Sequence, residues 1–223
     1  MPPGTGQREA RQTRCASCVS KSRRYFADRP ASDNTGSAQF DSTVHGMIET
    51  FRLILRPWCE SDFASFAGLN ADAMVMRFLG GVLTREESDA YARRAQRHLA
   101  DHGFCKWAVE APGVAPFIGA VGLSHARFEA SFTPAVEVAW RLNRRFWGQG
   151  YATEAARAAM QDGFTRVGLK EIIAITTLDN HPSQRVMERL GMTRSIEFDH
   201  PLIAEGNPLR RHILYNLQAP SGG

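Results

Sequence analysis

The sequence is poor in cysteine and has no long apolar run, and both absences narrow its class. Only 4 of its 223 residues are cysteine, too few for a disulfide framework in a chain of this length. Cys15 and Cys18 form a CxxC pair, but no second pair of ligands stands nearby, so no metal site is predicted. No apolar run approaches the ~20 residues of a membrane-spanning helix, and no signal-peptide segment follows the N-terminal arginines. We therefore expect a cytoplasmic protein without a membrane partner.

The sequence also lacks a strong charge imbalance. The net charge is +4, and much of the basic excess falls in residues 1–46. The nearly balanced remainder does not indicate a nucleic-acid partner. Residues 1–46 are rich in Pro, Gly, Ser, Arg and Thr, so we expect them to be disordered, or to precede a true translation start at Met47. One domain is predicted over residues 47–218, followed by a flexible tail at 219–223.

Hydrophobic periodicity and turn residues divide the domain into strands and helices. Thr84 and Glu87 fit a capping box, and Gly103 ends the helix that they open. Strands are predicted at residues 52–57, 104–110, 117–124, 136–142, 171–178, 193–198 and 209–217, and helices at 60–69, 72–79, 84–102, 150–167 and 182–190. The order predicts an α/β fold with a single mixed sheet of about six to seven strands and flanking helices.

The stretch from Asn143 to Ala155 joins a strand to a helix with two glycines and no acid before Glu154. Backbone N–H groups at a helix start, together with the helix dipole, favour a bound anion. Gly148 and Gly150 allow the backbone to approach such an anion closely. An ordinary strand-to-helix turn capped by glycine fits the same residues, so both interpretations stay open at this point.

Three motifs in chain order resemble the GCN5-related N-acetyltransferases (GNAT), and within them the subgroup of ribosomal-protein N-terminal acetyltransferases. Arg145–Gly150 has the form [QR]-x-x-G-x-[GA] of the acyl-CoA pyrophosphate loop, and Tyr151–Ala155 is the extension typical of the subgroup. Asn180–Met192 matches the family segment N-x-x-S-x-x-(V/L)-x-x-x-L-G-(F/M). Met76–Gly81 also resembles a segment of this family. The resemblance covers roughly residues 49–217.

The resemblance implies two parallel strands, at 136–142 and 171–178, that splay apart around acetyl-CoA. Backbone and side-chain groups of both strands and of the loop are then expected to bind this co-substrate. The implied set is Val138, Ala139, Trp140, Leu142, Arg145, Phe146, Trp147, Gly148, Gln149, Gly150, Tyr151, Ala152, Asn180 and Ser183. The N–H groups near Val138 and Ala139 are expected to stabilise the thioester oxygen.

Glu137 is the candidate catalytic base, which would take the amine proton through a water. The alternative is a solvated strand residue, or one paired with Arg141. Asp179 is a weaker candidate base, and it also fits a helix cap. Ser183 is the candidate donor to the leaving thiolate, against a structural role in the first turn of a helix.

Two departures from the family pattern weaken the assignment of catalysis. Met187 stands where many members carry a thiolate-protonating tyrosine, and Ile175 stands where some carry a glutamate base. A non-catalytic acyl-CoA-binding sensor therefore remains an alternative to acetyl transfer. The acceptor would be a small-molecule amine or a protein N-terminus, and the chain a monomer or homodimer. His125 and His181 are not spaced as metal ligands.

Overall fold

The structure, a computed structural model, describes residues 46–220 of the chain. The expectations for residues 1–45, including the CxxC pair, and for residues 221–223 lie outside the described residues. The strands are β1 (Ile48–Glu49), β2 (Ile54–Arg56), β3 (Lys106–Ala111), β4 (Ala115–His125), β5 (Val136–Leu142), β6 (Glu171–Thr177), β7 (Thr193–Asp199) and β8 (Arg211–Gln218). The helical elements are α2 (Glu60–Asn70), α3 (Ala73–Met76), α4 (Arg85–His102), η1 (Arg144–Phe146), α5 (Tyr151–Asp162), η2 (Gly163–Val167) and α6 (His181–Arg189).

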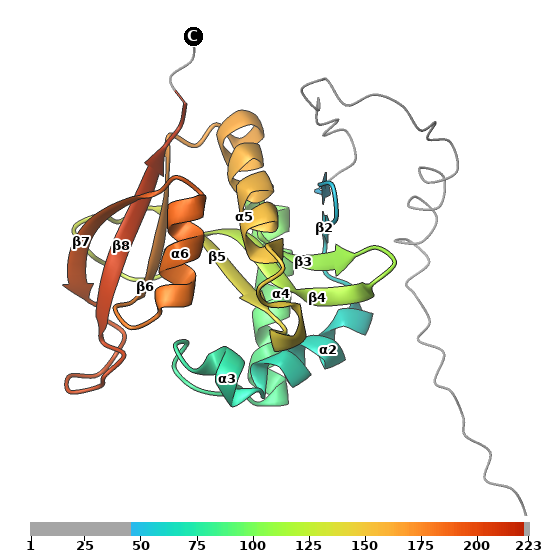
Figure 1. Cartoon of the computed structure of the whole chain (residues 1–223), viewed down its shortest axis with the longest axis horizontal. Helices are drawn as coiled ribbons and strands as arrows, with labels where there is room; N and C mark the ends of the chain where they lie inside the picture. The colour runs from blue at the N-terminus through green and yellow to red at the C-terminus, as the bar shows by residue number, and fades with distance from the viewer. Residues whose placement is uncertain (1–45, 221–223) are drawn as a thin grey trace, which may run out of the picture.

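All described strands form one sheet in the order β1-β2-β3-β4-β5-β6-β8-β7 (Figure 1). The predicted mixed α/β sheet is confirmed, with eight strands in place of six to seven. The additional strand is β1, which has only two residues, too few for an alternating pattern to reveal it. The Thr50 hydroxyl and the Leu53 N–H, 2.9 Å apart, hold the bend that separates β1 from β2.

The strands β5 and β6 are the one parallel pair of the described sheet, and they are joined at a single position, Glu137 with Ile173. On its other edge β5 pairs with β4 along its whole length, from Val136 with His125 to Leu142 with Gly119. Strand β6 pairs equally fully with β8. The sheet is therefore two well-paired halves that separate beyond Glu137, as expected (Figure 1).

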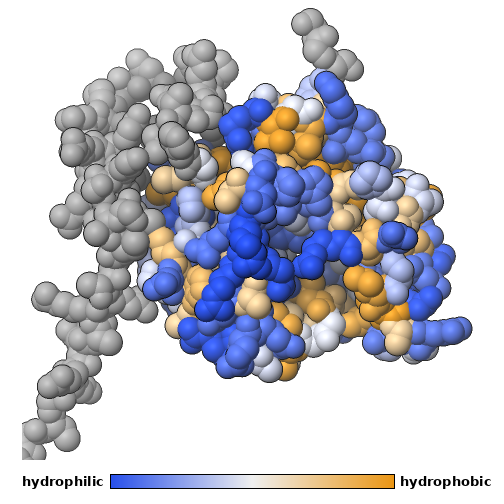
Figure 2. All heavy atoms as spheres, turned by 180° about the vertical axis from the view of Figure 1, so that it is seen from behind, coloured by the Kyte–Doolittle hydropathy of each residue, from blue (hydrophilic) through white to orange (hydrophobic). Residues whose placement is uncertain are grey.

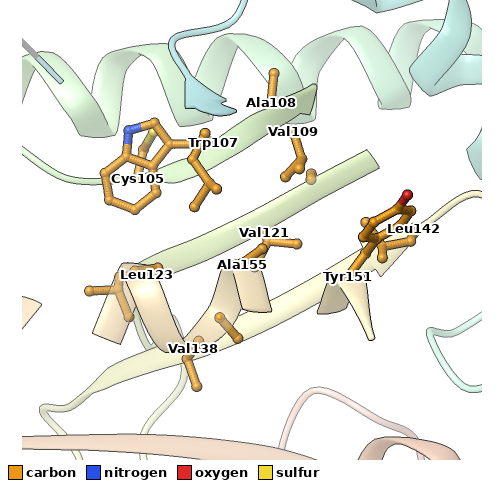
Figure 3. Packing of buried hydrophobic residues seen from close by; sticks show 14 of the residues in the cluster. Cys105, Trp107, Ala108, Val109, Val121, Leu123, Val138, Leu142, Tyr151 and Ala155 are labelled. Carbon is orange, nitrogen blue, oxygen red and sulfur yellow. The ribbon is translucent and has the colours of Figure 1, made fainter. Parts of the chain in front are cut away.

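Helices cover both faces of the sheet half that contains β4 and β5. Helix α5 packs on β4 and β5, and Val121 and Val138 lie beside Ala155 in this layer (Figure 3). Strand residues alternate between faces, so the neighbours of Val138 along β5, including Glu137, point toward the opposite layer of α2 and α4. This alternation places Glu137 on the face opposite α5.

The ends of two helices test the cap predictions. Thr84 and Glu87 form the predicted capping box, because Thr84 Oγ1 accepts from the Glu87 N–H at 3.2 Å and Glu87 Oε2 accepts from the Thr84 N–H at 2.8 Å. Gly103 ends α4 with a φ of 75°. Helix α5 is shorter than predicted, because the chain widens into the π-helical turn η2 at Gly163.

None of the helices within residues 46–220 is long and apolar enough to cross a bilayer.

Candidate active site

The loop after β5 presents its backbone at the start of α5. Gly148 and Gly150 adopt φ values of 74° and 80°, the left-handed region that favours glycine. Asn143 caps η1, since its Oδ1 accepts from the Arg145 N–H at 3.1 Å. These two features turn the chain sharply between the strand and the helix, and they confirm the predicted strand-to-helix connection.

The backbone N–H groups from Gly148 to Thr153 make no hydrogen bond within the described part of the chain. The first bond of this helix start is made by the Glu154 N–H, which donates to the Gly150 carbonyl at 3.0 Å. Helix α5 has 12 residues, so its dipole adds partial positive charge at the same place. The loop therefore offers a row of open donors at a helix start, a geometry that fits both the predicted anion site and the glycine-capped turn.

Arg52, which we did not single out from the sequence, anchors this loop to the edge of the sheet. Its Nε donates to Glu154 Oε2 at 2.7 Å, and its Nη1 donates to the Gln149 carbonyl at 2.9 Å. The guanidinium also lies 4.7 Å from the centre of the Tyr151 ring. Thr50 Oγ1 donates to the other carboxylate oxygen of Glu154 at 2.6 Å. These contacts of Arg52 and Thr50 form a brace between the loop and the segment before β2. In the sequence, only Glu154, the first acid after Asn143, stood out among the residues of this brace.

The electrostatics of Glu154 follow from these contacts. Partial burial alone would raise the pKa of its carboxyl group. Hydrogen bonds from Thr50 and Arg52, together with the charge of Arg52, outweigh burial and leave the Glu154 pKa below its ordinary value. Glu154 is therefore ionised at neutral pH and bonded to the segment before β2.

The side chains of the predicted cofactor loop divide into two groups. Phe146 and Tyr151 are buried in the core, so they support the loop from below. Arg145, Trp147 and Gln149 are exposed. Their side chains, together with the backbone, form the outer surface of the loop.

The backbone of β5 turns only alternate residues toward the strand β6. The Asn143 N–H donates to the Ile118 carbonyl at 2.9 Å, which fixes Arg141 and Ala139 on the β4 side. Trp140 and Leu142 consequently direct their backbone groups toward the side where β6 diverges. The Leu142 carbonyl already accepts from Trp147 Nε1 at 2.8 Å.

Asn180 and Ser183 lie where β6 passes into α6. Asn180 caps the helix, because its Oδ1 accepts from the Ser183 N–H at 3.4 Å and its Nδ2 donates to Thr176 Oγ1 at 2.8 Å. One donor and one acceptor site of its amide are therefore used within the chain. The Ser183 hydroxyl has no hydrogen bond to the residues that the structure describes, and Asp179 is exposed. Met187, at the position where many family members carry a tyrosine, is only 1% exposed and packs in the core.

Glu137 is held by Lys106 and Ser124, and the predicted alternative of a pair with Arg141 is wrong. Lys106 Nζ donates to Glu137 Oε1 at 2.7 Å, and Ser124 Oγ donates to the same oxygen at 3.2 Å. Arg141 instead donates to Asn70 Oδ1 at 2.6 Å. Burial works against the charge of Lys106, but attraction to Glu137 raises the Lys106 pKa above its ordinary value.

A ring cluster that the sequence did not reveal lies on the face of Glu137. His212 is directly opposite Thr177 on β6 and Phe198 on β7, so the three share a face. His200 packs 5.0 Å from His212 between ring centres, and Phe128 packs 4.6 Å from His200. Burial first, and then the charge of His212, lower the pKa of His200, while the Glu137 carboxylate acts in the opposite direction. These rings come from three segments distant in sequence, so no local spacing predicts them.

The face of Thr177 also holds a polar atom without a partner. Thr177 Oγ1 is the buried side-chain oxygen or nitrogen that lacks a hydrogen bond among residues 46–220. It lies at the end of β6, beyond the position where β6 is paired with β5.

Figure 2 shows the molecule from behind the view of Figure 1, with hydrophilic side chains over much of that face and apolar patches between them.

Comparisons with known proteins agree with this geometry. Residues 52–193 match the family described as Acetyltransferase (GNAT) domain. The chain is 32% identical over 162 residues to the uncharacterized N-acetyltransferase YnaD of Bacillus subtilis, covering 72% of this chain and 89% of that protein. It is 26% identical over 156 residues to spermidine N(1)-acetyltransferase of Escherichia coli, covering 68% and 78% of the two chains.

A solved structure supports the fold. The ribosomal-protein acetyltransferase RimL in complex with coenzyme A superposes with a TM-score of 0.63 over 77% of this chain and 97% of that chain. Its sequence identity is 19%, so the likeness shows the fold. The family match, the splayed parallel strands and the open N–H groups of the loop lead to one assignment. The chain belongs to the GNAT family of acyl-CoA-dependent N-acetyltransferases.

Proposed function

We propose that the protein transfers the acetyl group of acetyl-CoA to a primary amine by direct attack within a ternary complex. The observation that carries the proposal is the run of open N–H groups from Gly148 to Thr153, set at the end of two separating strands. The pyrophosphate would lie on these donors, and the pantetheine arm would continue toward Trp140 along the open edge of β5. Both contacts use the backbone, which explains why the loop needs glycines more than particular side chains.

The chemical step requires a nucleophilic amine, a stabilised oxyanion and a protonated leaving group. The amine nitrogen bonds to the thioester carbon, the carbon–sulfur bond breaks, and the electron pair leaves with the sulfur. Trp140 turns its N–H group toward the β6 side beyond the bridge of Glu137 with Ile173, so we assign the thioester oxygen to this edge; the Val138 N–H points the same way but belongs to that bridge. The N–H of Ala139 points to β4 and is replaced in this role by that of Trp140.

We assign Glu137 as the general base that takes the proton from the amine. Both of its hydrogen bonds fall on Oε1, so Oε2 is without a bond to the described residues. This fixed orientation lets Oε2 hold a water, or the amine itself, at the position where β5 and β6 begin to separate. Ser183 is our candidate donor to the thiolate, because its hydroxyl is unused at the start of α6 and Met187 is enclosed in the core.

The acceptor is either a small-molecule amine or a protein N-terminus. The relatedness to a spermidine acetyltransferase supports the first, and the likeness of fold to RimL is compatible with the second. The rings of Phe128 and His200 beside the face of Glu137 offer aromatic surface to an aliphatic or cationic group near the amine.

A free-thiol assay with acetyl-CoA and a panel of amines and N-terminal peptides tests the proposal. We expect Glu137→Gln to lower kcat by about 100-fold, the usual contribution of a general base, while the affinity for CoA stays within about twofold. Glu205→Gln is the matched control, since Glu205 is exposed on the connection between β7 and β8. Tight CoA binding with no acetylation of any acceptor would instead support the acyl-CoA sensor, which the buried Met187 favours.

A further inference from the structure

Three histidines meet at one corner of the fold, outside the residues assigned to acyl-CoA. His98 and His102 lie four residues apart on the last turns of α4, and His125 is the last residue of β4. One ring nitrogen from each lies within 4.8 Å of those of the other two. From the sequence we expected no metal site, since His125 is not spaced as a metal ligand along the chain. It approaches the α4 pair only through the placement of β4 in the sheet.

The tautomer of His98 is set by the backbone. Its Nδ1 donates to the Phe104 carbonyl at 2.8 Å, so Nε2 carries the lone pair in the neutral ring. Nε2 lies 3.1 Å from His125 Nδ1 and accepts from the His125 backbone N–H at 3.3 Å, a long hydrogen bond that a bound ion would replace. Two imidazole nitrogens bound to one tetrahedral zinc ion at 2.0–2.1 Å lie roughly 3.3–3.4 Å apart, so the observed pair needs little movement. A carbonyl that fixes the far nitrogen of a ligating histidine is the usual outer support of such sites.

The surroundings suit a bound cation with an open position. The ring of Phe104 packs 4.9 Å from His98 and 5.4 Å from His125 and walls one side. His102 and His125 are exposed, so water can complete the coordination. Partial burial and the neighbouring histidines lower the pKa values of His98 and His125, although the Phe104 carbonyl opposes this for His98.

We propose that His98, His102 and His125 form a binding site for a divalent first-row transition-metal ion, for which we take Zn²⁺ as the occupant. Three imidazole ligands and one water give the tetrahedral arrangement that this ion prefers, and no carboxylate is needed. Bound there, the ion would join the end of α4 to the end of β4 and so hold together two elements that share the corner. The site does not depend on the acetyl-transfer proposal.

The test is calorimetric titration of Zn²⁺ into the full-length, tag-free protein without CoA, whose thiol would compete for the metal. Cys15→Ser/Cys18→Ser is used as the background, because that pair is a second candidate for zinc. We expect one equivalent to bind with a dissociation constant of 10 µM or tighter, on the order of −7 kcal/mol. Co²⁺ in place of Zn²⁺ should give the visible absorption of a tetrahedral site.

Two exposed ligands permit variants that leave the core intact. His102→Ala and His125→Ala should each weaken Zn²⁺ binding by at least about 10-fold and abolish the Co²⁺ absorption. His181→Ala is the matched control, since His181 is an exposed histidine at the start of α6, and it should bind as the background does. Absence of stoichiometric binding, or equal losses in His102→Ala and His181→Ala, would overturn the proposal. Unchanged circular dichroism of each variant is the folding control.

Discussion

Replacing Arg52 by alanine should weaken acyl-CoA binding far more than it weakens the fold. The side chain is 41% exposed, and its ion pair with Glu154 spans 2.6 Å. An exposed ion pair contributes about 0–1 kcal/mol, and the hydrogen bond to the Gln149 carbonyl contributes about 1 kcal/mol. We therefore expect Arg52→Ala to lower the free energy of unfolding by about 1–2 kcal/mol, a few degrees in Tm.

The expected loss of CoA affinity in Arg52→Ala arises from the loop between β5 and α5. Arg52 is the side chain that anchors the Gln149 carbonyl, near the start of the run of N–H donors. Without it, at least one more backbone residue must be ordered when CoA binds, at a cost of about 1–2 kcal/mol. That cost corresponds to roughly a 5- to 30-fold increase in the dissociation constant of CoA. The KM for the amine should change little, because Arg52 lies on the phosphate side.

The assay is calorimetric titration of CoA, with urea unfolding of the same preparations. Arg194→Ala is the control, because Arg194 makes a comparable exposed ion pair with Glu197 at 2.8 Å but lies on β7. It should show a similarly small loss of stability and unchanged CoA affinity. The reasoning is refuted if Arg52→Ala binds CoA as tightly as the wild type, or if both variants lose affinity equally.

Three further outcomes follow from buried or braced groups. Gly122→Ala should destabilise the protein by about 3 kcal/mol in urea unfolding, because its Cβ would overlap the Cys105 carbonyl oxygen; a loss below 1 kcal/mol would contradict that packing. Arg56→Met should cost roughly 3–5 kcal/mol, since it leaves the buried Asp62 carboxylate without its partner; near-wild-type stability would contradict the buried pair. The folded-state pKa of Glu154 is lowered, so the stability that its brace contributes is complete above the unfolded value of 4.5 and is lost as pH falls through the folded value. The difference in unfolding free energy between the wild type and Arg52→Ala should therefore shrink between pH 7 and pH 3.

The sequence was informative where one local signal determines one local structure. The capping box at Thr84 and the strand Val136–Leu142 were predicted correctly, because each depends on residues next to one another in the chain. The same holds for the loop at Gly148 and Gly150, whose glycines predict both the tight turn and the exposed N–H groups. The role of the loop as an acyl-CoA site required the family resemblance, since an anion site alone names no ligand.

The parts that could not be predicted depend on contacts between distant segments. Lys106 reaches Glu137 across β4, so the partner of the candidate base is visible only once the strands are in register. Arg52 reaches Glu154 because the bend between β1 and β2 lies close to α5, which packs against the edge strand β1. The histidines of the proposed zinc site come together in the same way, through the placement of β4 beside the end of α4.

The central claim is that the N–H groups from Gly148 to Thr153 receive the acyl-CoA pyrophosphate. The most direct measurement is a titration of the ¹⁵N-labelled protein with CoA, followed through its backbone amide resonances. We predict that the largest shifts fall on the amides of Gly148 to Thr153 and that Gly148→Val removes them together with CoA binding. CoA binding that leaves these amide resonances in place and moves those of another segment would contradict the account.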